Sequence, residues 1–222
     1  MKEQLMPGSN ELGEAAIIKD DILPKVHQRE LVRMIADPTF PWFFHKGIAV
    51  SDDHPEYHVE HADIVEDSYG FFHNTYWGGL LDNTANTDRE GCTPAYQLIE
   101  PISYFLSEKF EFVYQKVIRC RMGFHVPRVG WTSANFHAPH VDQTGLDPSQ
   151  TITVLYYVFD SDGDTFIFNE NLRDGKPENV TVKERITPKA NRAVLLDGGQ
   201  YHASSCPTQT TQRVTINFNY LI

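Results

Sequence analysis

The chain has 222 residues and a formal net charge of −11, a length that suits one domain with its own core and a charge that disfavours nonspecific binding to nucleic-acid backbones. Its three cysteines form no CxxC pair, which excludes a zinc ribbon, and their odd, small number favours a reducing, cytoplasmic location. No stretch approaches the ~18 consecutive apolar residues of a membrane span, and the N-terminus has no apolar signal-peptide region.

The N-terminal half predicts helices separated by loops. The stretch DILPKVHQRELVRMIAD places apolar residues at helical spacing, and Asp37-Pro38 ends it. Residues 40–44 are too aromatic for a surface loop and are expected to pack on the core. From residue 51 to about residue 93 the pattern is irregular and rich in Asn, Asp and Gly, which predicts mostly loop. A second amphipathic helix is expected over TPAYQLIEPISYFLSEKF.

After Glu111 the sequence changes to short β-rich runs separated by Gly, Pro, Asn and Asp. These runs are FVYQKVIRCRMGF, TITVLYYVF, DTFIFNE, NVTVKERI, RAVLLD and QRVTINFNYLI. Strands at this regular spacing predict a β-sandwich or a small barrel. We therefore expect one domain over residues 1–222, with a helical and loop flank at 1–110 and a β core at 111–222.

Two His-x-Asp pairs occur, His61-x-Asp63 and His140-x-Asp142. In an extended segment such a pair points both side chains the same way, and an iron(II) oxygenase site needs two imidazoles and one carboxylate on one face of the metal. Only the second pair is followed, across β-rich segments, by a distant third ligand, His202. The dense polar cluster DHPEYHVEHAD around the first pair is interpreted as a solvent-facing segment, with a substrate lid as the alternative.

The last predicted strand has two chemically different faces. Its polar face carries Arg213, Thr215, Asn217 and Asn219, and its apolar face carries Val214, Ile216, Phe218 and Tyr220. Taken alone, this pattern is typical of an ordinary amphipathic strand with one wet face. Taken with the three candidate ligands, it puts a guanidinium beside a metal, where its rigid fork could hold a carboxylate through two parallel hydrogen bonds.

The order of these residues resembles the 2-oxoglutarate- and Fe(II)-dependent oxygenases, most closely their prolyl-4-hydroxylase-like branch. The order is His140-x-Asp142, then His202 sixty residues later, then Arg213-x-Thr215. The segment TITVLYYVFDSDGDTFIF is similar to that branch's Tyr-rich strand, which leads to a Gly-Gly-x-Thr turn. The resemblance covers residues 117–220, about half of the chain.

The resemblance implies a mainly β fold, with a double-stranded β-helix (jelly-roll, cupin-like) core and flanking N-terminal α-helices. It implies that His140, Asp142 and His202 bind Fe(II), and that Arg213, Thr215 and Tyr157 hold 2-oxoglutarate. Only one of Tyr156 and Tyr157 can point inward, because neighbours on a strand face opposite ways. The implied activity is that of a dioxygenase, which uses O2 to hydroxylate an unidentified substrate and converts 2-oxoglutarate to succinate and CO2.

Two alternative functions stay open. A cupin-like metal-binding protein or dioxygenase that does not use 2-oxoglutarate is favoured if Arg213 faces away from the metal. A jelly-roll binding or structural domain is favoured if the three ligands are misaligned. If the carboxylate is held by another residue, the candidates are Arg119, Arg121 and Arg128.

The predicted turn after residue 159 departs from the branch, because Asp162 stands where its first turn glycine would be. The run Asp160, Asp162 and Asp164 suggests a calcium loop, but the glycine and glutamate that such a loop requires are missing, so we interpret it as a solvated turn. His137 is expected beside the metal ligands or at the rim of the site, and His125 receives no role.

Overall fold

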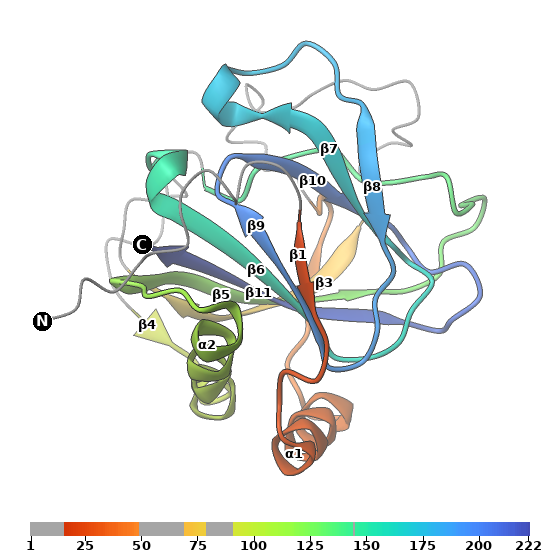
Figure 1. The fold of residues 1–222 in the computed structure, drawn as a ribbon. Helices are drawn as coiled ribbons and strands as arrows, with labels where there is room; N and C mark the ends of the chain where they lie inside the picture. The colour runs from red at the N-terminus through yellow and green to blue at the C-terminus, as the bar shows by residue number, and fades with distance from the viewer. Residues whose placement is uncertain (1–15, 49–68, 79–90, 144) are drawn as a thin grey trace, which may run out of the picture.

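The computed structural model describes residues 16–48, 69–78, 91–143 and 145–222 (Figure 1). His61 and Asp63 lie outside these described residues, so the interpretation of that pair stays a prediction. The described chain forms two antiparallel sheets, and two helices lie beside the larger one (Figure 1).

Strands from both halves of the chain build the larger sheet. In spatial order they are β1 (Ile17–Lys19), β9 (Arg192–Asp197), β6 (Thr151–Tyr157), β11 (Arg213–Leu221), β5 (Lys116–His125), β3 (Gly70–Trp77) and β2 (Phe43–His45), and β4 (Gly91–Cys92) pairs with β3. The smaller sheet contains β10 (Gln200–Ser204), β7 (Thr165–Asn171) and β8 (Val182–Ile186). The chain is therefore mainly β, as predicted.

The two helices cover one face of the larger sheet. Helix α1 (Lys25–Ala36) buries Leu31 and Ile35, and helix α2 (Tyr96–Phe110) buries a row that includes Ile99, Ile102 and Leu106. These side chains share one apolar cluster with residues of β5, β6 and β11. Burying each such side chain stabilises the fold by about 1.5–3 kcal/mol, so this cluster holds the two helices against one face of the larger sheet.

Strand β11 divides its two kinds of side chain between the two faces of the larger sheet. The apolar residues Val214, Ile216, Phe218 and Tyr220 lie in the helix-covered cluster. The polar residues Arg213, Thr215 and Asn217 line a cavity on the opposite face. The predicted alternation of this strand is confirmed, and its polar face points into the protein rather than into solvent.

Both predicted helices and all six predicted β runs form, but the flank prediction was wrong in part. Residues 70–77, expected to be loop, form β3 and pair with β5. Within residues 1–110 the described segments supply the four strands β1 to β4. Pairing with β5 overrides the turn-rich neighbourhood of β3, because strand propensity depends strongly on tertiary partners.

The aromatic run at residues 40–44 packs only partly on the core. Phe40 and Trp42 contact the helix-covered cluster, as expected. Phe43 and Phe44, however, are more than half exposed, at 57% and 58%. Among the described residues, their strand β2 is the last of the larger sheet, and no further strand pairs with its outer side.

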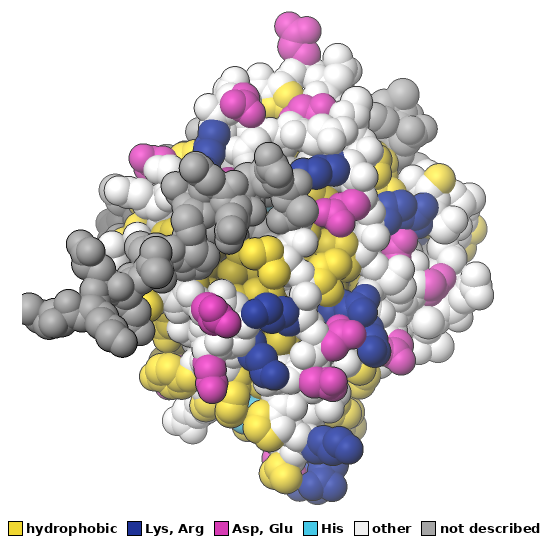
Figure 2. Space-filling view, viewed as in Figure 1, with side chains coloured by type: hydrophobic (Ala, Val, Ile, Leu, Met, Phe, Trp, Pro, Cys, Tyr) yellow, Lys and Arg dark blue, Asp and Glu magenta, His cyan; other side chains and the backbone are white. Residues whose placement is uncertain are grey.

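The surface bears on the predicted partners and location. On the face shown in Figure 2, acidic and basic side chains of the described residues are interspersed, rather than gathered in the basic stripe that follows a nucleic-acid backbone. Neither α1 nor α2 is long and apolar enough to cross a membrane. The expected lack of nucleic-acid binding and the cytoplasmic location stay predictions.

Asp162 organises the turn between β6 and β7. One carboxylate oxygen accepts hydrogen bonds from the backbone N–H groups of Thr208 and Gln209, and the other accepts one from Thr210. The hydroxyls of Thr208 and Thr210 donate to it as well. Asp160 and Asp164 have other partners, Ala190 and Arg185, so the three carboxylates do not converge. Asp162 thus holds the loop that leads into β11.

Replacing Asp162 with Asn is expected to lower the free energy of unfolding at pH 7 by about 1–2 kcal/mol, since an amide accepts these bonds poorly. Burial alone would raise the pKa of Asp162, but the hydrogen bonds from Thr208 and Thr210 hold this pKa below its ordinary value. Its stabilisation is therefore present above the unfolded pKa of about 3.9 and is lost as pH falls further. Denaturant unfolding from pH 7 to pH 3 should show the difference from wild type shrinking. Asp160→Asn is the control, and an equal loss in that variant would contradict the assignment.

Candidate active site

Three polar side chains converge where the two sheets face each other. His140 and Asp142 lie in the loop between β5 and β6, and His202 lies in β10. The backbones of His140 and His202 pair in antiparallel fashion, with two N–H···O bonds of 3.0 Å. One potential ligand atom from each of the three side chains lies within 4.8 Å of the others. The backbone pairing thus brings together two histidines that are 62 positions apart in the chain.

The two imidazoles are oriented so that the same ring nitrogen of each is available. Nδ1 of His140 lies 3.0 Å from the Ala138 carbonyl oxygen, and Nδ1 of His202 lies 3.0 Å from that of Gln200. A carbonyl can only accept, so in the neutral ring each Nδ1 carries the proton and each Nε2 keeps its lone pair. The Nε2 atoms lie 3.9 and 3.7 Å from the Asp142 carboxylate, which is beyond hydrogen-bond distance. Both are therefore free to act as ligands.

The carboxylate of Asp142 is held by a ring of donors. Oδ2 accepts bonds from Thr153, Asn217 and Asn219, at 3.1, 2.9 and 3.1 Å. Oδ1 accepts one bond of 2.9 Å, from Arg119 Nη2. A carboxylate oxygen has about two lone-pair positions, so Oδ1 keeps one for a further partner.

The protonation states of this group suit a cation. Burial, followed by the proximity of His202, lowers the pKa of His140 to about 4. For Asp142, burial alone would raise the pKa, but His202, Arg119 and His140 together hold it well below its usual value. Near neutral pH the site therefore presents a neutral His140 and an ionised Asp142. Two imidazoles and one carboxylate form the ligand set of non-haem iron(II) sites.

Arg119 is a residue of the site that we did not predict in this role. The sequence offered it only as a substitute for Arg213, yet it pairs with Asp142, and its Nε donates to Asn219 at 3.0 Å. Strand parity carried a usable signal, because Arg119, Arg121, Gly123 and His125 alternate along β5 and all line the cavity. The position of Arg119 next to Asp142 depends on the pairing of β5 with β11. A single sequence does not reveal this pairing.

The cavity between the sheets contains the three converging residues and Arg213 together. It measures about 510 Å³ with the open space at its mouth included, which suits a small molecule. Arg213 is 3% exposed, and its Nε and Nη2 donate to the Gly163 carbonyl oxygen and to Thr165 Oγ1, at 2.8 and 2.9 Å. Among the described residues no acidic side chain forms a salt bridge with it.

The remaining turn glycine gives Arg213 its room. A Cβ on Gly163 would lie 2.8 Å from the Ser205 carbonyl oxygen and 3.0 Å from Arg213 Cδ. The first contact is closer than real Cβ atoms adopt and the second is tighter than most of them, so a larger residue would displace the loop or the arginine. The change of the neighbouring turn glycine to Asp162 therefore leaves the contact with Arg213 in place.

The other two residues assigned to the cosubstrate occupy different positions. Thr215 lines the cavity beside Arg213. Tyr157 is buried among apolar residues between the sheets, and its hydroxyl lies 2.7 Å from that of Thr165. Tyr156 faces the helix-covered cluster on the opposite side. Tyr157 is thus the inward-facing tyrosine, and its hydroxyl reaches Arg213 through Thr165.

Several solved structures share this fold. An oxidoreductase of the 2OG-Fe(II) oxygenase family from Burkholderia pseudomallei aligns with a TM-score of 0.58 and 16% identity, over 96% of this chain and 88% of that chain. A prolyl hydroxylase from Trichoplax adhaerens, in complex with a hypoxia inducible factor oxygen degradation domain peptide fragment, aligns with a TM-score of 0.56 and 15% identity, over 96% and 86%. The alpha ketoglutarate dependent carbocyclase SnoK from nogalamycin biosynthesis aligns with a TM-score of 0.58 and 12% identity, over 99% of this chain and 85% of that chain.

These likenesses establish the fold. The chain has the jelly-roll fold of 2OG-Fe(II) oxygenase structures, a prolyl hydroxylase among them, so the predicted fold class and structural resemblance are confirmed. No protein-family model and no curated protein matches the sequence. The chemistry of this chain has to be argued from its own residues.

Proposed function

We propose that the protein is a 2-oxoglutarate- and Fe(II)-dependent oxygenase that hydroxylates an as yet unidentified substrate. The observation that carries the proposal is the buried Arg213, which lines the same cavity as His140, Asp142 and His202. An uncompensated buried charge costs several kcal/mol, and no acidic side chain among the described residues forms a salt bridge with Arg213. The nearby carboxylate of Asp164 is paired with Arg185 instead. An anion bound in the cavity would compensate the charge of Arg213.

The residues present fit iron. Nε2 of His140, Nε2 of His202 and Oδ1 of Asp142 would hold the ion, because each has a lone pair and no competing proton. When bound with 2-oxoglutarate and O2, iron supplies the oxidation of a substrate C–H bond, coupled to release of succinate and CO2. The donors around Asp142 and the carbonyls behind the imidazoles keep the three ligands in orientation.

Arg213 would bind the distal carboxylate of 2-oxoglutarate. The Gly163 carbonyl and Thr165 hydroxyl fix its guanidinium, so little side-chain freedom is lost when the anion binds. Thr215 adds a hydroxyl on the same face of β11. Tyr157 would act by holding Thr165, and a direct contact with the cosubstrate stays a prediction.

The alternative, a metalloprotein that does not use 2-oxoglutarate, required Arg213 to face away from the metal ligands. Arg213 instead lines their cavity, which favours the oxygenase. We also propose that residues 1–222 form one domain, because α1, α2 and the larger sheet share one apolar cluster.

The test of the proposal is succinate formation. Purified protein with Fe(II), ascorbate and 2-oxoglutarate should form succinate slowly without substrate, and a panel of peptides, amino acids, nucleobases and small metabolites should contain a compound that accelerates it. The His202→Gln variant is the background control. If the iron-loaded wild type forms no more succinate than this variant with any compound, the proposal fails.

Replacing Arg119 with Met is expected to weaken Fe(II) binding about 10- to 100-fold, because residues that orient a metal ligand typically contribute that much. Arg119 bonds Oδ1 of Asp142, and Met keeps its bulk without the bond. Anaerobic competition against a chromophoric chelator measures the affinity. Arg121→Met is the matched control, since Arg121 lines the same cavity. Tighter binding in Arg119→Met would show that repulsion between its charge and the metal outweighs its role in orientation.

A further inference from the structure

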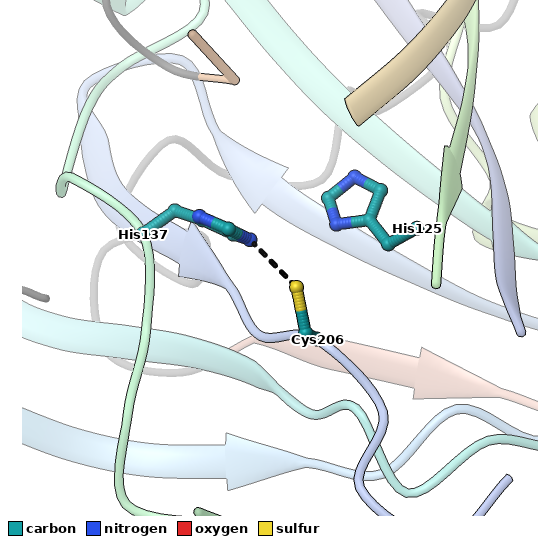
Figure 3. A group of neighbouring side chains, drawn as sticks. All are labelled: His125, His137 and Cys206. Atoms are coloured by element: carbon teal, nitrogen blue, oxygen red, sulfur yellow. Dashed lines mark hydrogen bonds between the residues drawn. The ribbon is translucent and has the colours of Figure 1, made fainter. Parts of the chain in front are cut away.

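A second group of ligand-type side chains lies next to the cavity. His125 ends β5, His137 lies in the loop that follows, and Cys206 lies in the loop after β10. Their side chains converge from these three segments, as Figure 3 shows. One ligand atom of each lies within 4.8 Å of the others, and Cys206 Sγ is 3.5 Å from His137 Nε2.

All three residues are buried, so of the two positions expected for His137, beside the metal ligands or at the rim, the rim is excluded. His125, His137 and Cys206 are 3%, 0% and 3% exposed. Burial, followed by the charge of Arg213, holds the pKa of both imidazoles well below the usual value, so both are neutral. The group is therefore a set of uncharged nitrogen and sulfur donors inside the protein.

The orientation of His125 is a separate observation that points to a ligand. Among the described residues its fully buried Nδ1 has no hydrogen-bond partner, although buried polar atoms are nearly always paired. In Figure 3 the ring nitrogen next to its Cβ-bearing carbon is directed toward Cys206 and His137. An ion placed among the three residues would satisfy this atom.

The observed separation also fits a shared ion. Sulfur and nitrogen ligands at about 2.3 and 2.0–2.1 Å from one metal lie about 3.6 Å apart at a tetrahedral angle and about 3.8 Å apart at the wider angle of a three-ligand site. The distance of 3.5 Å between Cys206 Sγ and His137 Nε2 is close to these values. The same distance allows a weak thiol hydrogen bond, which the metal would replace.

We propose that His125, His137 and Cys206 bind one copper(I) ion, at a site separate from the proposed iron site. Thiolate is a soft ligand that selects copper(I) or zinc, and a His₂Cys set is a known arrangement at copper. The net charge of the bound complex distinguishes copper(I) from zinc(II) at this group. Copper(I) with one thiolate and two neutral imidazoles is neutral overall, whereas zinc(II) would leave a net positive charge close to Arg213. Three ligands also leave zinc short of its usual four.

Binding releases one proton, because Cys206 must lose its thiol hydrogen as the copper–sulfur bond forms. The copper stays in the monovalent state, so no oxidant or reductant is consumed. His125 also lines the cavity, so the group lies next to the space from which an ion could enter. The proposal does not rest on the iron chemistry, since the two sets of proposed ligands have no residue in common.

The test is anaerobic titration of the metal-free protein with copper(I), in competition with a chromophoric copper(I) chelator. The expected result is one copper per chain, with affinity reduced at least 10²-fold in Cys206→Ser and in His137→Gln. Cys92→Ser, which changes an exposed cysteine, and His202→Gln, which changes an iron ligand, should keep wild-type affinity.

Copper X-ray absorption on the wild type needs no variant and should show one sulfur and two imidazole neighbours. No stoichiometric binding, loss of binding in Cys92→Ser or His202→Gln, or an absorption spectrum without sulfur would overturn the proposal. A parallel titration measures zinc(II) affinity. If zinc(II) binds at Cys206 with higher affinity than copper(I), the assignment of the ion as copper(I) is wrong.

Discussion

Arg213→Ala is expected to raise the 2-oxoglutarate concentration needed for half-maximal turnover by a factor on the order of 10² or more. Removing one partner of a buried charged hydrogen bond costs about 2–5 kcal/mol, and each 1.4 kcal/mol is tenfold. Arg213 is buried in the cavity and two of its nitrogens are already fixed by the protein, so its fork is held ready for an anion. Saturation curves for succinate formation measure the effect.

Three comparisons separate binding of the cosubstrate from general damage. Fe(II) affinity should change far less than 2-oxoglutarate affinity, because Arg213 is not among the three proposed ligands. Arg213→Lys should recover only part of the loss, since an ammonium cannot form the two parallel bonds. Arg121→Ala removes a charge from the same cavity and should change 2-oxoglutarate affinity much less. If Arg213→Ala keeps normal affinity, the carboxylate is held elsewhere, and Arg119, Arg121 and Arg128 become the candidates.

His202→Gln is expected to abolish turnover and to weaken Fe(II) binding by more than about 10²-fold, a larger loss than the 10–100-fold typical of residues that only orient a ligand. This variant is a sharper test than Asp142→Ala. Asp142 accepts bonds from Arg119, Thr153, Asn217 and Asn219, so its removal would leave a buried charge unpaired and disturb the fold.

The His202 side chain donates a hydrogen bond to the Gln200 carbonyl oxygen. Loss of this one bond should leave the thermal unfolding temperature of the metal-free protein near that of wild type. His125→Gln changes another buried histidine that lines the cavity and should retain iron binding. If His61→Ala and Asp63→Ala abolish iron binding while His202→Gln does not, the metal ligands were assigned to the wrong pair.

Local patterns predicted those parts of the site in which one strand determines the outcome. The alternation of β11 put Arg213, Thr215 and Asn217 on one face, and period-2 geometry holds wherever a strand is paired on both sides. The same rule separated Tyr156 from Tyr157. The three proposed ligands follow from spacing together with the resemblance, and the structure adds that backbone pairing brings His140 and His202 together.

Other features depend on contacts between segments far apart in the sequence, and the sequence alone could not supply them. The pairing of Arg119 with Asp142, and the meeting of His125, His137 and Cys206, are set by the packing of loops against β5 and β10. Strand β3 was missed because its residues form a strand through pairing with β2, β4 and β5, which lie elsewhere in the chain.

The central claim is that His140, Asp142, His202 and Arg213 form one site for iron and 2-oxoglutarate. The most direct measurement is visible absorption of the protein under anaerobic conditions, as Fe(II) and then 2-oxoglutarate are added. The account predicts a weak charge-transfer band that requires both additions, is absent in His202→Gln, and in Arg213→Ala appears only at much higher 2-oxoglutarate concentration. A wild-type protein that binds Fe(II) tightly and yet shows no band at saturating 2-oxoglutarate would contradict it.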